Sequence, residues 1–303
     1  MVSIRTESLT KQYGSVHALH ELDLVIEEGE VFGFLGPNGA GKTTTIDLLL
    51  DFIRPTNGTA TVCGYDAQEE TDEVRARVGI LPDGFDLWER SSGRRHLEFA
   101  IKAKGANDDP DYLLERVGLD RADAERNVSE YSKGMRQRLG MAMAIAGDPD
   151  LLILDEPSTG LDPHGIRRMR DIITEAAGGG TTVFFSSHIL GQVAAVADRV
   201  GILDDGKLVA TDTIAGLQES AGIGDDLVLS LDRPYDGDLT AIDGVVDTYR
   251  QNGALRVRFA DPKAKGPVVH RLVDDGVTVQ DLTVEEATLE DLFEAYTNGG
   301  VNA

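Results

Sequence analysis

The alternation of apolar and polar positions divides the chain into two regions. In the first, residues 2–9 and 22–26 alternate as antiparallel strands do, whereas residues 31–35 and 151–154 are almost entirely apolar. Short apolar strands that alternate with helical segments indicate a parallel sheet with helices on both faces. We therefore predict an α/β domain whose amino-terminal part forms a small antiparallel β-subdomain.

The spacing of the other apolar positions completes this region. It predicts helices over residues 41–52, 166–176 and 189–197, and strands over residues 59–63, 182–185 and 199–203. Between about residues 93 and 146 the sequence shows no strand pattern, and three helical segments fit there. We expect these helices to form a subdomain of about residues 84–146 that is inserted into the α/β domain.

The pattern changes after about Ser220. Short strands are predicted over residues 227–231, 245–249, 255–259 and 277–282, with a helix over residues 263–273. A last helix is predicted over residues 288–296, where Thr288 and Asp291 have the spacing of a capping box. Its apolar face consists of Leu289, Leu292, Phe293 and Tyr296. We therefore predict two domains, residues 1–220 and a small accessory α+β domain of residues 221–303.

The composition indicates a globular protein, with 41% hydrophobic residues. No apolar run approaches the roughly 20 residues that a transmembrane helix needs, and the amino terminus lacks the apolar stretch of a secretory signal. Cys63 is the only cysteine, which excludes an intramolecular disulfide, and we expect it to be a small buried residue on a strand. These features predict a cytoplasmic protein.

The chain carries a formal net charge of −24, and acidic residues exceed basic ones both before and after residue 220. Among the basic residues, Arg greatly outnumbers Lys. Such a surface indicates a salt-loving microbe, because dissolved ions screen the mutual repulsion of the carboxylates. The same charge argues against nucleic-acid binding, which needs a basic surface.

Residues 36–43, Gly-Pro-Asn-Gly-Ala-Gly-Lys-Thr, match the G-x-x-x-x-G-K-[ST] phosphate-binding motif. They lie between an apolar strand and a helix. This context favours a phosphate-binding loop over the alternative, a glycine-rich turn with an incidental lysine. Lys42 is expected to reach the β- and γ-phosphates of a nucleotide, and the Thr43 hydroxyl to bind Mg²⁺. The predicted nucleotide contacts of this loop are Gly36, Pro37, Asn38, Gly39, Ala40, Gly41, Lys42, Thr43 and Thr44.

Two acids, Asp155 and Glu156, follow the apolar strand of residues 151–154. Carboxylates at the end of a buried strand are costly unless a cation or a water molecule uses them. We predict that Asp155 binds Mg²⁺, directly or through water, and that Glu156 polarises the attacking water. Such a pair can also cap a helix, but beside the phosphate loop it indicates a nucleoside triphosphatase.

Residues 131–138, Tyr-Ser-Lys-Gly-Met-Arg-Gln-Arg, resemble the L-S-G-G-Q signature motif of ATP-binding-cassette (ABC) proteins. Ser132 and Gly134 match that motif, whereas the other three positions depart from it. In the family, the signature motif of one subunit faces the phosphate loop of another. The resemblance therefore implies a homodimer in which Ser132 and Gly134 contact the ATP that is bound to the partner chain.

Three further segments extend this resemblance. Residues 155–163 are similar to the family's joined Walker B motif and D-loop, which includes Asp162 as a nucleotide-site residue. His188 follows two serines and resembles the switch histidine, and Tyr13 resembles the aromatic residue that stacks on adenine. The resemblance covers about residues 2–220 and implies an ABC-type P-loop fold with ATP and Mg²⁺ as ligands.

Two site residues retain a second interpretation. Asp83 stands where the family has Gln or Glu, so it is predicted to bind Mg²⁺ through water or a shifted loop; alternatively it is a turn residue after Pro82. His188 is predicted to sense the γ-phosphate, although a histidine after a strand can also be structural. The other histidines are expected to be surface or packing residues.

The resemblance also indicates what the ATP drives. The S-K-G-M variant and the carboxy-terminal Ala-Thr-Leu-Glu-Asp-Leu-Phe resemble multidrug and daunorubicin-resistance exporter subunits. This implies an ATPase that is bound to the inner face of the cell membrane through a separate transmembrane permease. The alternative is a soluble switch ATPase that acts on a protein or ribosomal partner.

Two surfaces leave their roles open. Phe85, Leu87 and Trp88 could form the apolar groove that receives the permease in this family, or they could pack in the core. The accessory domain could stabilise the dimer, or it could bind a ligand or regulator.

Overall fold

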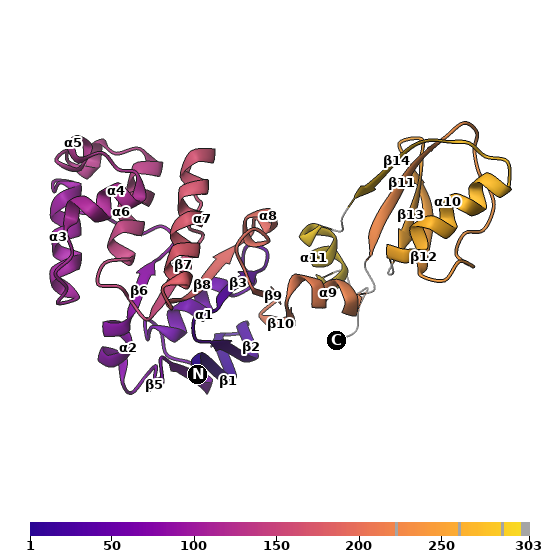
Figure 1. Cartoon of the computed structure of the whole chain (residues 1–303). Coiled ribbons are helices and arrows are strands. Elements are labelled where there is room, and N and C mark those ends of the chain that lie inside the picture. The colour runs from indigo at the N-terminus through magenta and orange to yellow at the C-terminus, as the bar shows by residue number, and fades with distance from the viewer. Residues whose placement is uncertain (222–223, 260–261, 286–287, 298–303) are drawn as a thin grey trace. The chain divides into compact units, whose positions relative to one another are not determined.

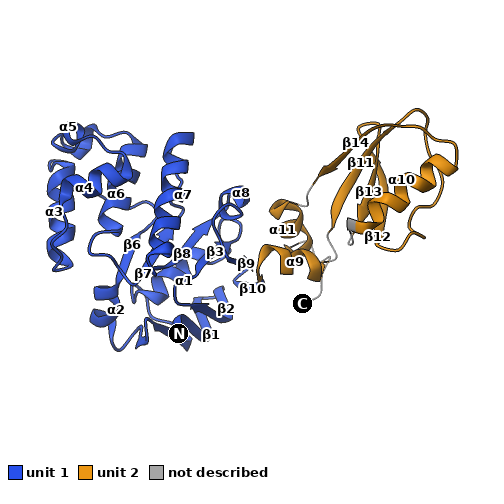
Figure 2. Cartoon of the chain, viewed as in Figure 1, with its two compact units in different colours: residues 1–211 blue, residues 212–303 orange. Residues whose placement is uncertain are grey.

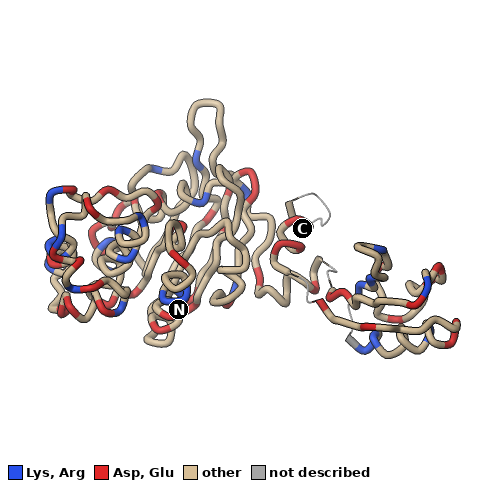
Figure 3. Tube along the Cα trace, turned by 90° about the horizontal axis from the view of Figure 1, so that it is seen from above, with Lys and Arg blue, Asp and Glu red and all other residues tan. Residues whose placement is uncertain are grey.

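The computed structural model describes residues 1–221, 224–259, 262–285 and 288–297 of the chain. These residues form two compact units, Met1–Thr211 and Asp212–Ala303 (Figure 2). Acidic residues are distributed along the backbone of both units (Figure 3). None of the helices in the described ranges is long and apolar enough to cross a membrane.

A six-stranded sheet forms the centre of the first unit (Figure 1). Its order is β10 (Lys207–Asp212), β9 (Arg199–Asp204), β3 (Val31–Leu35), β8 (Thr182–Ser187), β7 (Leu151–Asp155) and β6 (Val78–Leu81). The pairs from β9 to β6 are parallel, which confirms the predicted core. Because β8 lies between β3 and β7, the residues that follow these three strands share one edge of the sheet.

A second, four-stranded sheet forms the predicted antiparallel subdomain. Its order is β2 (Val16–Glu27), β1 (Val2–Tyr13), β4 (Asn57–Val62) and β5 (Tyr65–Asp66). Its apolar side chains, such as Ile4, Leu24 and Ala60, share one buried cluster with Phe32 and Phe184 of the parallel sheet. The two sheets therefore have a common core.

Helices complete the first unit. The parallel strands are connected by α1 (Lys42–Leu49), α2 (Thr71–Arg77), α7 (Pro163–Gly178) and α8 (Leu190–Val193). The inserted region contains α3 (Gly93–Ala103), α4 (Pro110–Val117), α5 (Arg121–Ala124), the 3₁₀ turn η1 (Val128–Glu130) and α6 (Lys133–Ala144). It thus has one more α-helix than predicted, because Gly118, in the left-handed region, ends α4 and α5 begins three residues later.

The second unit has a sheet of its own. The strands β12 (Val245–Gln251), β13 (Ala254–Phe259), β11 (Asp225–Leu231) and β14 (Val279–Glu285) pair antiparallel in this order. The 3₁₀ turn η2 (Pro262–Ala264) precedes α10 (Lys265–Asp274), whose Val268 and Leu272 pack on the apolar side chains of the sheet. All four strands and this helix lie at the predicted positions within a few residues.

A helix pair shifts the boundary between the units. The prediction placed the boundary after Ser220, whereas α9 (Ile214–Ala221) belongs to the second unit and packs against α11 (Leu289–Thr297). The Tyr296 hydroxyl donates to the Leu217 carbonyl at 3.2 Å. At the start of α11, Thr288 and Asp291 exchange the hydrogen bonds of the predicted capping box.

Cys63 differs from its expected setting. It follows β4 in the turn to β5, has a φ of 49° and is only partly buried. The prediction of a buried strand residue is therefore wrong, because the strand ends one residue earlier at Val62.

Candidate functional site

The phosphate loop joins β3 to α1, and two of its glycines, Gly36 and Gly41, have close backbone neighbours. A Cβ at Gly36 would lie 2.5 Å from the Leu203 carbonyl oxygen, and one at Gly41 would lie 2.6 Å from that of Ala18. Gly41 also has a φ of 110°, a backbone conformation that residues other than glycine rarely adopt. This backbone can therefore bring its N–H groups close to phosphate oxygens.

Lys42 lies inside this loop. Its side chain is 7% exposed, and Nζ donates to the Gly36 carbonyl at 2.7 Å and the Pro37 carbonyl at 3.3 Å. Nζ also lies 3.6 Å from Oε1 of Glu156. The ammonium group is thus held by the loop and faces the Glu156 carboxylate.

Asp155 and Thr43 are brought together from α1 and the end of β7. The Thr43 hydroxyl donates to Oδ2 of Asp155 at 2.9 Å, and Asp155 is almost fully buried. Hydroxyl and carboxylate oxygens are ligands that Mg²⁺ prefers, and Mg²⁺ commonly needs only one or two such protein ligands beside substrate phosphates. The described residues hold no group of three or more acidic, His or Cys side chains arranged for a metal. The pair therefore fits a magnesium site that a nucleotide completes.

Glu156 lies between Lys42 and His188. Its Oε2 is 2.8 Å from Nδ1 of His188, while Oε1 faces Lys42 and has no hydrogen-bond partner among the described residues. Its φ of 49° is unusual for a residue other than glycine. The structure thus brings the three predicted catalytic residues, Lys42, Glu156 and His188, into one connected group.

Ser186 is a site residue that the motif analysis did not assign. Its hydroxyl donates to Oδ1 of Asp155 and accepts from the Glu156 backbone N–H at 3.1 Å. Ser186 pairs directly with Asp155 in the parallel ladder between β8 and β7. Ser186 is therefore placed beside Asp155 by the register of the two strands, which short sequence motifs do not specify.

The signature motif forms the start of α6. Ser132 caps the helix, since its Oγ accepts the Met135 N–H at 3.2 Å, and its side chain is exposed. Within the described residues, neither Ser132 nor Gly134 forms a hydrogen bond with the phosphate loop of its own chain. The prediction that these residues serve a nucleotide in a partner chain remains open.

Asp162 has a local structural role in the chain. It caps α7 by accepting the Gly165 N–H at 2.6 Å, and it lies 3.3 Å from a guanidinium nitrogen of Arg138. The Gly165 hydrogen bond, followed by the charge of Arg138, holds the pKa of Asp162 below its ordinary value. The predicted contact of Asp162 with nucleotide is not among these interactions and stays a prediction.

Tyr13 and Asp83 are both exposed. The Tyr13 ring lies at the end of β1 with Nζ of Lys11 4.9 Å above it, and no other residue covers it by ring stacking in the described chain. Asp83 lies in the turn after β6, whose Leu81 pairs with Leu154 beside the acidic pair. Asp83 forms no hydrogen bond with Thr43 or Asp155.

The three residues of the predicted apolar groove do not share one surface in the structure. Phe85 packs against Gly140 of α6, where an added Cβ would collide with the ring, and Leu87 is buried. Trp88, by contrast, is 55% exposed, stacks on His96 and meets the exposed Phe99 edge to face. Core packing accounts for the first two residues, and an exposed Trp88–Phe99 patch replaces the groove.

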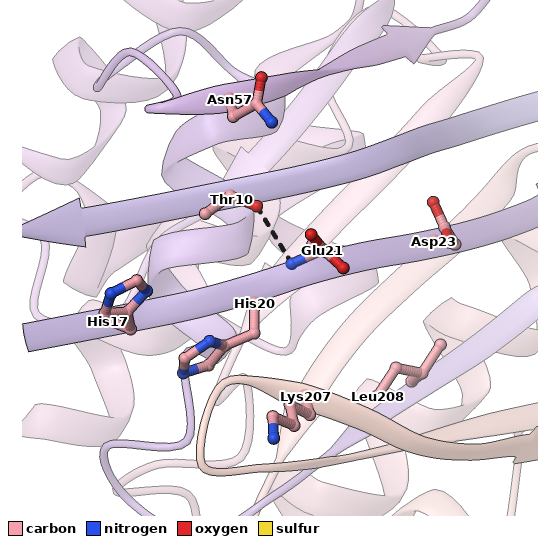
Figure 4. A pocket seen from close by; sticks show the side chains of 8 residues that line it. All are labelled: Thr10, His17, His20, Glu21, Asp23, Asn57, Lys207 and Leu208. Carbon is pink, nitrogen blue, oxygen red and sulfur yellow. Dashed lines mark hydrogen bonds between the residues drawn. The ribbon is translucent and has the colours of Figure 1, made fainter.

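A separate pocket of about 670 Å³ lies on the antiparallel sheet (Figure 4). Its lining includes His17 and His20, whose rings stack 4.7 Å apart, and Lys207 from β10. None of the predicted site residues lines it. The pocket is therefore distinct from the phosphate-binding region.

Comparison with known proteins identifies the family. A family model described as ABC transporter matches residues 19–159. The bacitracin transport ATP-binding protein of Enterococcus faecalis is 32% identical, over 98% of this chain and 97% of that protein. The chain belongs to the ATP-binding proteins of ABC transporters. A daunorubicin resistance ATP-binding protein of Streptomyces coeruleorubidus is 37% identical to this ABC protein, over 96% of the chain and 94% of the relative.

Solved structures agree with this assignment. The ATP-binding subunit of an ABC transporter covers 72% of this ABC protein with a TM-score of 0.67 and 28% identity. A dimeric ATP-binding cassette that is bound to ADP and phosphate covers 70% with a TM-score of 0.65 at 22% identity, which supports the fold. The protein is an ABC-type ATPase, and the residues matched by the family model lie within its first unit.

Proposed function

We propose that this ATPase drives export through a separate membrane permease and acts as a homodimer that closes around two ATP molecules. The observation that carries the proposal is the contrast between the connected Lys42–Glu156–His188 group and the exposed Ser132 at the start of α6. One chain thus offers a phosphate site and, separately, an unused helix start that can bind phosphate.

In the proposed reaction, the phosphate loop binds the triphosphate and Lys42 exchanges its carbonyl partners for phosphate oxygens. Mg²⁺ held by Thr43 and Asp155, with Asp83 acting through water, would neutralise charge on the phosphates. Glu156 orients the attacking water and accepts its proton, and His188 donates a hydrogen bond to the γ-phosphate. The Tyr13 ring stacks on adenine.

Ser132 and Gly134 of the partner complete each site in this proposal. The Ser132 hydroxyl, whose oxygen already accepts from Met135, can still donate its own proton to a γ-phosphate oxygen. The N–H groups at the start of α6 add a favourable partial charge. Together they supply from across the interface the stabilisation that other phosphoryl-transfer enzymes obtain from an arginine finger.

The names of the relatives support export of a drug as the proposed role. Their names refer to bacitracin transport and daunorubicin resistance, and they match almost the whole chain, including the accessory unit. The exposed Trp88–Phe99 patch is the surface that we propose for the permease, since aromatic side chains are enriched at protein interfaces. The protein would then lie at the inner face of the membrane. A soluble switch ATPase is not favoured by these relatives.

The Glu156→Gln variant tests the proposal. It keeps the size of the side chain but cannot accept the proton, so hydrolysis is expected to fall by about 10²–10⁴-fold, and a stable dimer should accumulate with ATP. Phosphate release and analytical ultracentrifugation measure the two effects, with Glu7→Gln on the exposed face of β1 as the control. A Glu156→Gln protein that stays monomeric with ATP, or hydrolyses it rapidly, would contradict the mechanism.

Membrane capture tests the partner. The same variant, trapped with ATP, should recover a multi-span permease from solubilised membranes, and Trp88→Ser should reduce that recovery. Recovery of ribosomes instead would favour the switch ATPase.

We also propose adaptation to high salt, on the basis of the net charge of −24. The free energy of unfolding should then rise with KCl concentration, because screening relieves the repulsion among carboxylates. A free energy that falls steadily with salt would argue against it.

A further inference from the structure

The signature helix α6 also contacts the loop that carries the catalytic carboxylate of its own chain. Gln137, one turn into α6, is 8% exposed, and its Nε2 donates to the Pro157 carbonyl at 3.0 Å. Pro157 directly follows Glu156. The hydrogen bond thus connects the helix that Ser132 caps with the backbone beside the catalytic residue.

The backbone at Glu156 needs support. Its φ of 49° lies in the left-handed region, a strained conformation for a residue other than glycine that persists only when neighbouring contacts enforce it. Two contacts hold it locally: the Glu156 N–H donates to Ser186, and the Glu156 carbonyl accepts from Thr159 N–H at 3.1 Å. Gln137 holds the next peptide group, and so fixes the turn that aims the Glu156 side chain at Lys42 and His188.

The first turn of α6 packs against the same loop at a second point. A Cβ on Gly134 would lie 3.0 Å from the Gly160 carbonyl oxygen, and the Lys133 side chain covers Gly160. A side chain at position 134 would therefore crowd the loop of its own chain as well as an approaching phosphate. Because these contacts are tight, α6 and residues 156–160 are expected to shift together.

We propose that Gln137 is a positioning residue that holds Glu156 in place and couples the two ATP sites of the dimer. The inference rests on the proposed function. Ser132 and Gly134 at the start of α6 face the nucleotide bound to the partner chain, while Gln137 of the same helix holds the Glu156 that acts on the nucleotide of its own chain. Binding of ATP at one site is thereby transmitted to the carboxylate of the other.

The Gln137→Met variant tests this role, because methionine has a similar size and no N–H donor. We expect kcat to fall by about 10- to 100-fold, as small misplacements of catalytic groups do, with KM for ATP little changed and the Hill coefficient reduced towards one. Gln68→Met is the matched control, since Gln68 Nε2 also donates to a backbone carbonyl, that of Leu48, at 2.8 Å. It should lower the melting temperature similarly and leave kcat and the Hill coefficient unchanged.

A second variant covers the case in which Gln137→Met does not fold. In Gln137→Glu, the ionised carboxylate cannot donate to Pro157, but the protonated acid can. Its kcat relative to wild type should therefore rise as the pH falls, whereas a purely structural role predicts a constant ratio. Suppose that the wild type hydrolyses ATP cooperatively, and that Gln137→Met or Gln137→Glu has the same kcat and Hill coefficient as the wild type at every pH. The positioning role is then wrong, and the proposed function stands. A wild-type protein without ATPase activity would refute the proposed function itself.

Discussion

The two halves of the proposed ATP site differ in how far a single chain completes them. Around the phosphate loop, Lys42, Asp155 and Glu156 are buried and each contacts another site residue. At the signature motif, Ser132 is exposed and its hydroxyl proton has no acceptor among the described residues. The comparison supports the proposal that the chemistry is prepared within each chain and is activated by a second chain.

The largest expected effect comes from the buried half. Lys42→Ala removes the charge that faces Glu156 and the phosphates, so hydrolysis should fall by about 10²–10³-fold or more. It also removes the ammonium group that lies 3.6 Å from the buried Glu156 carboxylate, which is unfavourable. Phosphate release measures the loss, with Lys207→Ala in the pocket of Figure 4 as the control. A Lys42→Ala enzyme with more than a tenth of wild-type activity would place the reacting phosphate elsewhere.

Ser186→Ala tests the link within the buried half. It leaves Oδ1 of Asp155 and the Glu156 N–H without their partner, a loss of about 1–3 kcal/mol in the free energy of unfolding. The concentration of Mg²⁺ for half-maximal activity should also rise, because Asp155 loses its orientation. Chemical denaturation and magnesium titration measure the two effects. An unchanged magnesium dependence would limit Ser186 to folding.

Gly134→Ala tests the exposed half. The new methyl group meets the Gly160 carbonyl and must displace the loop by a few tenths of an ångström, so we expect about a tenfold loss of kcat. ATP binding to the monomer should be unchanged, which equilibrium binding of a fluorescent nucleotide measures. Gly178→Ala is the control, since nothing lies within 4 Å of its added Cβ. Weaker ATP binding by the monomer would mean that Gly134 serves its own chain's site.

The smallest effect concerns the loop between the halves. Because the folded-state pKa of Asp162 is lowered, its cap on α7 stabilises the protein fully above the unfolded-state pKa and loses this contribution as the pH falls through the folded-state pKa. Asp162→Asn keeps a cap acceptor without the charge. The difference in free energy of unfolding between wild type and variant should therefore shrink below about pH 4. A difference that is constant with pH would contradict the role of the charge.

The fold and most of the site could be predicted because they depend on local sequence. The phosphate loop, the acidic pair and the capping box of Thr288 and Asp291 are short segments whose backbone chemistry is contained in a few adjacent residues. The alternation of apolar strands and helices gave the parallel sheet for the same reason. The position of α9 could not be predicted, because its one buried residue, Leu217, gives no periodic pattern.

By itself, the sequence determined that the chain is an ABC-type ATPase. The order of its motifs along the chain and the glycines within them identify the family without knowledge of the tertiary structure. Only the tertiary structure decided that Ser186 joins Asp155 to Glu156, that Gln137 holds Pro157, and that Leu87 is buried while Trp88 is exposed. The physical reason is that these outcomes depend on strand register and helix packing. Strand register and helix packing bring together residues that are twenty or more positions apart in the sequence. Packing also decides which of two adjacent side chains, such as Leu87 and Trp88, is buried.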